Sequence, residues 1–151
     1  MAVAIVTSEL AALNPYPAAL ARLRGTKIVI RAASDAKDTH AVWFHDGFVD
    51  LPDAAAFVAS RTGSPHSILH ELGHALDAAR PDLQARREAA YRHAMSEHLY
   101  DASAYATVSS TEYFAELSKA WLSSSRVAGT HAPLKTADPM GYALAAEAWD
   151  R

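Results

Sequence analysis

The residues best suited to chemistry are His70, Glu71 and His74, which form an H-E-x-x-H sequence. On a helix that turns about 100° per residue, His70 and His74 lie about 40° apart and one turn along, so both imidazoles can reach one metal ion. Glu71 lies about 100° from His70, where its carboxylate can reach a metal-bound water instead of the metal. The opposite side of this helix is apolar, with Ile68, Leu72, Ala75, Leu76 and Ala79. The pattern predicts a zinc site on a buried helix that faces a cleft.

A catalytic zinc ion needs three protein ligands and an open position, so two histidines are not enough. Asp77 and His66 lie on the same helix face, but a single helix cannot supply three sides of a tetrahedron. The third ligand is therefore expected from another element. Glu112 and Glu116 are one turn apart on a later predicted helix. Two neighbouring carboxylates raise each other's pKa unless a cation or a hydrogen-bond donor lies between them. A zinc ion bound to one carboxylate and a histidine N–H donated to the other would stabilise both in their charged form.

These motifs together resemble a known family. The run from His70 to Asp77 (HELGHALD), Tyr105, and the run from Glu112 to Glu116 (EYFAE) are similar to the anthrax lethal factor catalytic-domain family. These zinc metallopeptidases, also called toxilysins, include the secreted Pro-Pro endopeptidases. The resemblance covers roughly residues 28–122, and Tyr105 precedes Glu112 by seven residues, as the family's active-site tyrosine does.

The resemblance implies a role for each matched residue. His70, His74 and Glu112 would bind one Zn²⁺ ion, with Glu71 as general base and Tyr105 as hydrogen-bond donor to the transition state. Glu116 would orient a ligand histidine from outside the coordination sphere. Asp77 is expected to hydrogen-bond around the ligands or to cap local structure. The implied fold is a single zincin-like metallopeptidase domain spanning residues 1–151.

The elements that must position these residues can be read from propensity and from turn residues. The pattern predicts helices over 1–25 with a break at 14–17, over 53–59, 65–79, 82–99, 111–122 and 139–149. It also predicts strands over 27–31, 41–44 and 48–51, with a tight hairpin at Asp46-Gly47. Ser64 and Pro65 would begin the active-site helix. The result is an α+β chain, with an N-terminal helical segment (1–25), a small sheet and active-site helix (26–80), and a helical half carrying the third ligand (81–151).

The hairpin over 41–51 is the best candidate for an edge strand over the cleft, along which an extended peptide would bind. Trp43 or His45 would then contact substrate side chains. The remaining histidines, His40, His93, His98 and His131, are interpreted as ordinary surface or partly buried residues. The solvated face of the helix over 82–99 is expected to carry Arg86, Arg87 and Arg92.

Composition excludes several other classes of function. The 151 residues include eight histidines and no cysteine, which rules out thiol nucleophiles and cysteine-based zinc sites. A net charge of −3 argues against nucleic acid as a partner. No apolar stretch is long enough for a membrane span, and the opening MAVAIVTSEL lacks a basic region and a long apolar core. We expect a soluble protein without a signal peptide in this chain, secreted or delivered as a processed effector domain.

The sequence therefore predicts a zinc-dependent endopeptidase, toxin-like or secreted, whose partner is a peptide or protein substrate. Glu71 would take a proton from the metal-activated water and later deliver it to the leaving amine. The ligand set leaves two alternatives open. One is a non-catalytic binding module that zinc stabilises, and the other is a thermolysin-type peptidase with a glutamate ligand. The pattern does not indicate whether a protein inhibitor exists.

Overall fold

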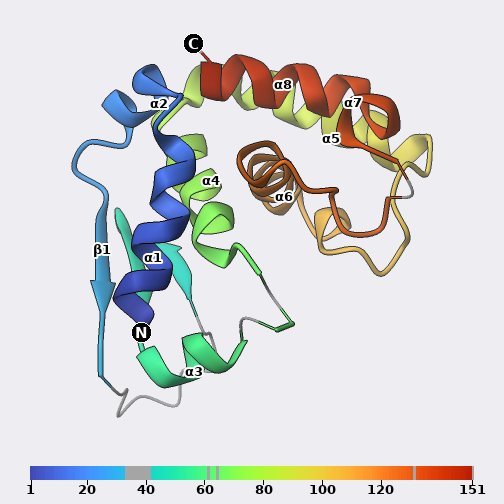
Figure 1. Cartoon of the computed structure of the whole chain (residues 1–151). Coiled ribbons are helices and arrows are strands. Elements are labelled where there is room, and N and C mark those ends of the chain that lie inside the picture. The colour runs from blue at the N-terminus through green and yellow to red at the C-terminus, as the bar shows by residue number, and fades with distance from the viewer. Residues whose placement is uncertain (33–41, 61, 64, 131, 151) are drawn as a thin grey trace.

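A computed structural model describes residues 1–32, 42–60, 62–63, 65–130 and 132–150 (Figure 1). A small three-stranded mixed sheet lies near the N-terminus and the rest of the described chain is mostly helical, which confirms the predicted α+β class. The N-terminal half contains α1 (Ala2–Leu10), η1 (Ala11–Leu13), α2 (Pro17–Arg22), β1 (Lys27–Ile30), β2 (Trp43–His45), β3 (Phe48–Leu51), α3 (Ala54–Ser60) and α4 (Ser67–Ala79). The C-terminal half contains η2 (Pro81–Leu83), α5 (Gln84–Ser96), η3 (Tyr105–Thr107), α6 (Ser110–Ser123), α7 (Leu134–Ala137) and α8 (Pro139–Asp150). Among these described helices, none is both long and apolar enough to cross a membrane.

The sheet has the strand order β1-β3-β2, with β1 parallel and β2 antiparallel to β3. Asp46 and Gly47 join β2 to β3, and both have positive φ angles, of 48° and 81°, as the predicted two-residue hairpin requires. His45 pairs with Phe48 across this turn, so the next pair, Phe44 and Val49, is the non-hydrogen-bonded type. Phe44 therefore directs its backbone N–H and C=O outward from the edge of the sheet.

The helix that carries His70 and His74 begins later than the sequence predicts. The expected start was Pro65, capped by Ser64, but α4 begins at Ser67, and position 64 lies outside the described residues. His66 is the N-cap in a left-handed conformation and its side chain makes no capping bond. Instead, the carboxylate of Glu9 on α1 accepts the Leu69 N–H at 3.3 Å. A carboxylate there also stabilises the positive end of the helix dipole.

Other boundaries shift by a few residues. The hairpin strand predicted over 41–44 is β2, over Trp43–His45, and position 41 lies outside the described residues. The helix predicted over 82–99 is divided into η2 and α5, which ends at Ser96. The breaks predicted near 14–17 and before Pro81 are present.

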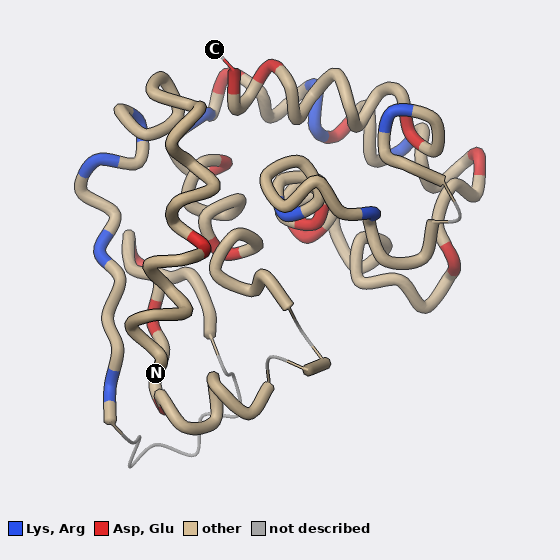
Figure 2. Tube along the Cα trace, in the orientation of Figure 1, with Lys and Arg blue, Asp and Glu red and all other residues tan. Residues whose placement is uncertain are grey.

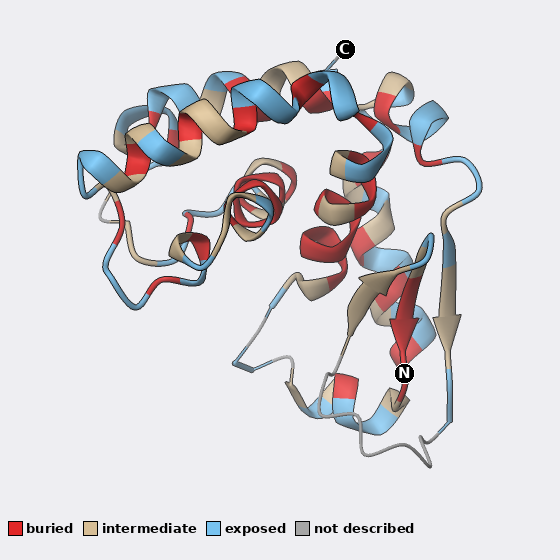
Figure 3. Ribbon diagram, turned by 180° about the vertical axis from the view of Figure 1, so that it is seen from behind, coloured by how far each residue is buried: buried red, intermediate tan, exposed pale blue. Residues whose placement is uncertain are grey.

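The core forms around α4 and α6, where buried residues are concentrated (Figure 3). Trp149 of α8 is fully buried, and its indole N–H donates to Ser118 Oγ of α6 at 3.1 Å. The helix pair α4 and α6 is thus held against the sheet on one side and against α8 on the other. This packing fixes the two helices that the sequence predicts to carry metal ligands.

Candidate metal centre

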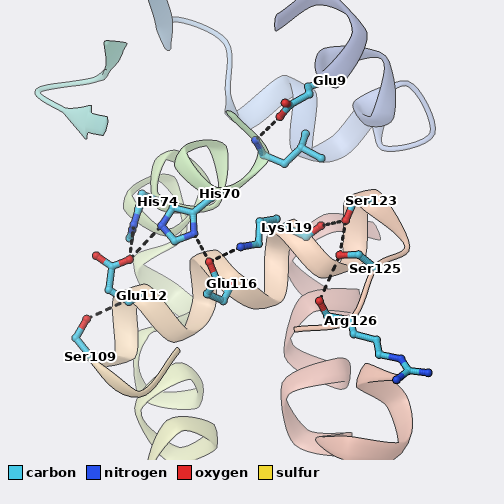
Figure 4. Close-up of polar contacts among 11 residues, drawn as sticks. Glu9, His70, His74, Ser109, Glu112, Glu116, Lys119, Ser123, Ser125 and Arg126 are labelled. Atoms are coloured by element: carbon cyan, nitrogen blue, oxygen red, sulfur yellow. Dashed lines mark hydrogen bonds and ion pairs between the residues drawn. The ribbon is translucent and has the colours of Figure 1, made fainter. Parts of the chain in front are cut away.

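Three side chains from α4 and α6 converge on one point (Figure 4). Glu112 Oε2 lies 3.1 Å from His70 Nε2 and 3.2 Å from His74 Nε2. One potential ligand atom from each of these residues lies within 4.8 Å of the others. The two histidines come from adjacent turns of α4, and Glu112 comes from the first turn of α6, whose N-cap Ser109 accepts the Glu112 N–H. The His70, His74 and Glu112 group, called the triad below, could bind a metal ion.

The donor set and its spacing fit zinc. Zinc with bonds of about 2.0–2.2 Å in tetrahedral geometry separates neighbouring ligand atoms by about 3.3 Å. The two measured separations, 3.1 and 3.2 Å, are close to this value. His70 also has a carboxylate at its other ring nitrogen, because Nδ1 lies 2.9 Å from Glu116 Oε1. A neutral imidazole has one N–H for these two carboxylates, so the ring needs a second proton or a cation at Nε2.

Glu116 orients His70 from behind. It is 3% exposed, and its Oε1 accepts from both His70 Nδ1 and Lys119 Nζ, which lies 2.6 Å away on the next turn of α6. An acidic and a basic stretch accordingly lie together on α6 (Figure 2). Burial raises the pKa of Glu116, but the His70 hydrogen bond and the Lys119 charge lower it further, so the net shift is downward. Glu116 therefore stays ionised and accepts the Nδ1 proton, which leaves Nε2 of His70 for the metal.

The triad shifts its own pKa values in opposite directions. Burial alone would lower the pKa of His70, but its hydrogen bonds to the Glu112 and Glu116 carboxylates raise it to about 9. Burial alone would raise the pKa of Glu112, but His70 and His74 lower it to about 2. Without a metal the triad is therefore held by an imidazolium facing carboxylates. A metal ion must displace that proton to bind.

We expect the chelator-treated protein to lose stability as the pH rises from 6.5 to 9. The pKa of His70 is raised from 6.5 to about 9, so this stabilisation is complete below pH 6.5 and is lost as the pH rises through 9. The shift corresponds to roughly 3 kcal/mol in the free energy of unfolding. Urea unfolding at several pH values with chelator measures it. Saturating zinc should remove the alkaline loss because it binds the deprotonated imidazole. Equal stability at pH 6 and pH 9 with chelator would contradict the prediction.

Gly73 sets the distance between α4 and α6, which carry the triad. A Cβ atom at this position would lie 2.9 Å from Ala115 Cα and 2.9 Å from Ser118 Cβ, closer than ordinary contacts. The backbones of α4 and α6 can approach this closely only because residue 73 has no side chain. Gly73 lies between His70 and His74 in sequence, so this contact brings Glu112 to them.

Gly73→Ala should therefore weaken zinc binding as well as the fold. The inserted methyl group pushes α6 from α4, and such overpacking costs about 1–3 kcal/mol of unfolding free energy. We expect zinc affinity to fall by about tenfold or more, which is the effect of losing a residue that positions a metal ligand. Competition with a chromophoric chelator measures the affinity. Gly63→Ala is the matched control because its nearest neighbour would be Ser60 O at 3.9 Å. Unchanged affinity in Gly73→Ala would show that this contact does not position Glu112.

A pocket of about 420 Å³ opens over the triad, between β2, α4, η3 and the start of α6. Its lining residues are Val42, Trp43, Phe44, His70, Glu71, His74, Asp77, Ala78, Tyr105, Thr111 and Glu112. Glu71 is 8% exposed, and burial raises its pKa, although the charges of His70 and His74 and the Phe44 backbone oppose the rise. The outward backbone of Phe44 in β2 thus faces the carboxylate that the sequence predicts as general base and lowers its pKa. A raised pKa suits a group that must take up and release a proton.

The chain matches no family model, no curated protein and no solved structure.

Tyr105 lies on η3 at the rim of the pocket and is 53% exposed. Its ring centroid is 5.7 Å from that of His70. Burial and the charges of Glu112 and Glu71 raise the pKa of the phenol. The hydroxyl group therefore keeps its proton and can donate a hydrogen bond into the pocket.

Asp77 also lines the pocket, but it is not part of the triad. Its carboxylate forms an ion pair with Arg87 of α5, and both side chains are 10% exposed. Burial raises the pKa of Asp77 above its ordinary value despite this cation. The prediction that Arg87 lies on a solvated face is wrong, because Arg87 is buried in its ion pair with Asp77 of α4. Arg86 and Arg92 are exposed, as predicted.

The residues predicted to contact substrate differ in position. Trp43 lines the pocket, whereas His45 is not among its lining residues and stacks on Trp43 with ring centroids 4.0 Å apart.

His66 lies at the start of α4 and lines a different pocket beside α1. His40 and His131 lie outside the described residues.

The sequence pattern did not predict the positions of Lys119 and the Phe44 backbone beside the site. Lys119 follows Glu116 by three residues, a helical spacing that indicates an ion pair, so that signal was available. A backbone donor leaves no trace in residue types.

Proposed function

We propose that the protein is a zinc-dependent endopeptidase of the H-E-x-x-H type. The observation that carries the proposal is the convergence of His70 Nε2, His74 Nε2 and Glu112 Oε2 in a pocket that also holds Glu71 and Tyr105. Two histidines and one glutamate are a ligand set of catalytic zinc in peptidases. When bound, zinc lowers the pKa of water at its open position to near neutrality and polarises the scissile carbonyl.

The side chains around the triad would share the proton and charge transfers. Glu71 accepts the proton of the attacking water and later gives it to the leaving amine. Its raised pKa favours uptake of the proton from the attacking water, and the Phe44 backbone faces its carboxylate. Tyr105 donates a hydrogen bond where negative charge develops on the carbonyl oxygen. Glu116 holds His70 in the tautomer that leaves Nε2 free.

Extended peptides are the substrates that this pocket favours. β2 is an edge strand and lines the pocket through Trp43 and Phe44, with Val42 just before it, so a peptide can add to the sheet beside the triad. The described lining residues include no lysine or arginine that could hold a terminal carboxylate. Asp77, which could attract a terminal amine, is paired with Arg87. These features favour cleavage within a chain over removal of terminal residues.

A zinc ion that only joined α4 and α6 would not need Glu71 and Tyr105 beside it. Their presence in the pocket favours catalysis over the binding-module alternative. A thermolysin-type peptidase would share the ligand set. The tyrosine seven residues before Glu112 favours the toxilysin resemblance, and with it a zincin-like fold and a role as a toxin-like or secreted effector.

The test is cleavage of a complex peptide library by the purified protein, with cuts mapped by mass spectrometry. We expect one zinc ion per chain, cuts within peptides, loss of cutting with a chelator and recovery on addition of zinc. Cutting that persists after complete removal of metal would refute the proposal. A protein that binds zinc and cuts no peptide would instead support the binding-module alternative.

A further inference from the structure

We propose that Tyr91 is a positioning residue that holds Tyr105 at the pocket. This inference rests on the proposed function, since it assigns Tyr105 a part in peptide hydrolysis. Tyr91 lies on α5 and does not line the pocket. It would act through the backbone of η3, the short turn that carries Tyr105.

The contact is a hydrogen bond from the Tyr91 hydroxyl to the carbonyl oxygen of Thr107, at 2.7 Å. Thr107 is the last residue of η3, two positions after Tyr105. The turn is tightened from within, because Thr107 Oγ1 and Thr107 N both donate to Ala104 O, at 2.8 and 2.9 Å. Ala104 and Ala106, on either side of Tyr105, are buried at 7% and 1% exposure. Tyr105 between them is half exposed, so its direction depends on this backbone.

Tyr91 is itself fixed by a buried cluster of tyrosines. Its ring lies 5.8 Å from that of Tyr113 on α6, whose hydroxyl donates to Asp138 Oδ2. Tyr100 donates to the same oxygen at 2.8 Å, and Asp138 is fully buried. The segment between α5 and α6 is thus held near its start through Tyr100 and near its end through Tyr91. Both attachments lead to α6, the helix that carries Glu112.

The distances explain why the position of Tyr105 matters for the proposed reaction. The Tyr105 ring lies 5.7 Å from the ring of the ligand His70, and its hydroxyl must reach an oxygen beside the metal. A misplacement of about 1 Å in such a group costs about 100-fold in rate. A half-exposed side chain on a three-residue turn has little packing to prevent it, so the Tyr91 hydrogen bond supplies the restraint.

The first test measures the turn itself by amide hydrogen exchange in Tyr91→Phe. The amides of Thr107 and Val108, which bond within the turn, should exchange about fivefold faster, as expected for loss of one hydrogen bond. Zinc affinity should stay within about twofold of wild type, because the triad lies on α4 and α6. The matched control is Tyr142→Phe, which removes a hydroxyl from α8, where the ring packs on Trp121. Unchanged exchange at Thr107 and Val108 would overturn the proposal, with or without peptidase activity.

The second test is a double-mutant cycle on cleavage of the same peptide library. Tyr91→Phe should lower the rate about tenfold when Tyr105 is present and by less than about twofold in Tyr105→Phe. Equal losses in both backgrounds would show that Tyr91 acts on the fold and would overturn the proposal. If wild-type protein cuts no peptide, the proposed function fails, whereas the exchange measurement still decides whether Tyr91 restrains the turn.

Discussion

Glu71→Gln should abolish peptide cleavage while zinc remains bound. The amide keeps the shape of the side chain but cannot accept a proton, and loss of a general base costs about 10²–10⁴ in rate. Glu71 is not in the triad, so the ligand set is intact. Peptide cleavage is followed by mass spectrometry, and bound zinc by elemental analysis of the dialysed protein.

The control for Glu71→Gln is Glu97→Gln, which makes the same change at an exposed site just after α5. It should match wild type in both measurements. Full activity of Glu71→Gln would exclude Glu71 as the base. Loss of zinc together with activity would mean that Glu71 holds the metal site together, and the rate loss could not then be assigned to proton transfer.

Glu112→Ala should remove most of the bound metal. Its Oε2 is the atom on which both imidazoles converge, so the change leaves two ligands on one helix. We expect zinc affinity to fall by more than the 10–100-fold that loss of an outer carboxylate costs. Competition with a chromophoric chelator measures the affinity, and circular dichroism checks that each variant is folded.

Asp77→Asn is the matched control, because Asp77 lines the same pocket but bonds to Arg87. This variant should keep its zinc, although removal of a charge from a buried ion pair lowers stability by a few kcal/mol. If Asp77→Asn empties the site and Glu112→Ala does not, the assigned third ligand is wrong. Glu112→Gln keeps nearly the shape of the glutamate side chain but removes its charge. Comparison with Glu112→Ala therefore separates loss of the charge from loss of local packing.

The parts of the site that the sequence could predict follow local geometry. Helical spacing brings His70 beside His74 and Glu112 beside Glu116, and the Asp-Gly pair specifies the hairpin. The need for a third ligand from a second helix followed from the coordination chemistry of zinc. These features depend only on residues that are close in the chain, or on a coordination requirement that a distant residue must meet.

The remaining features depend on contacts between residues far apart in sequence. Glu9 and Leu69 are 60 positions apart, and no local pattern shows that one caps the helix of the other. Arg87 lies in a charged, amphipathic-looking segment, yet α5 packs so that its guanidinium is buried on Asp77. The order of the three strands was also not predicted, because β1 pairs in parallel with β3 and not with the next strand along the chain.

The Glu9 contact has a consequence for how the metal is bound. Because a carboxylate of the first helix accepts a backbone N–H of the helix that carries both imidazoles, we expect docking of α1 and metal binding to be thermodynamically coupled. Anything that displaces the first ten residues would then lower the affinity for the metal ion. By reciprocity, the bound ion would stabilise the docking of those residues. The N-terminal segment would then resist proteases more strongly when zinc is bound, although this segment lies away from the ion.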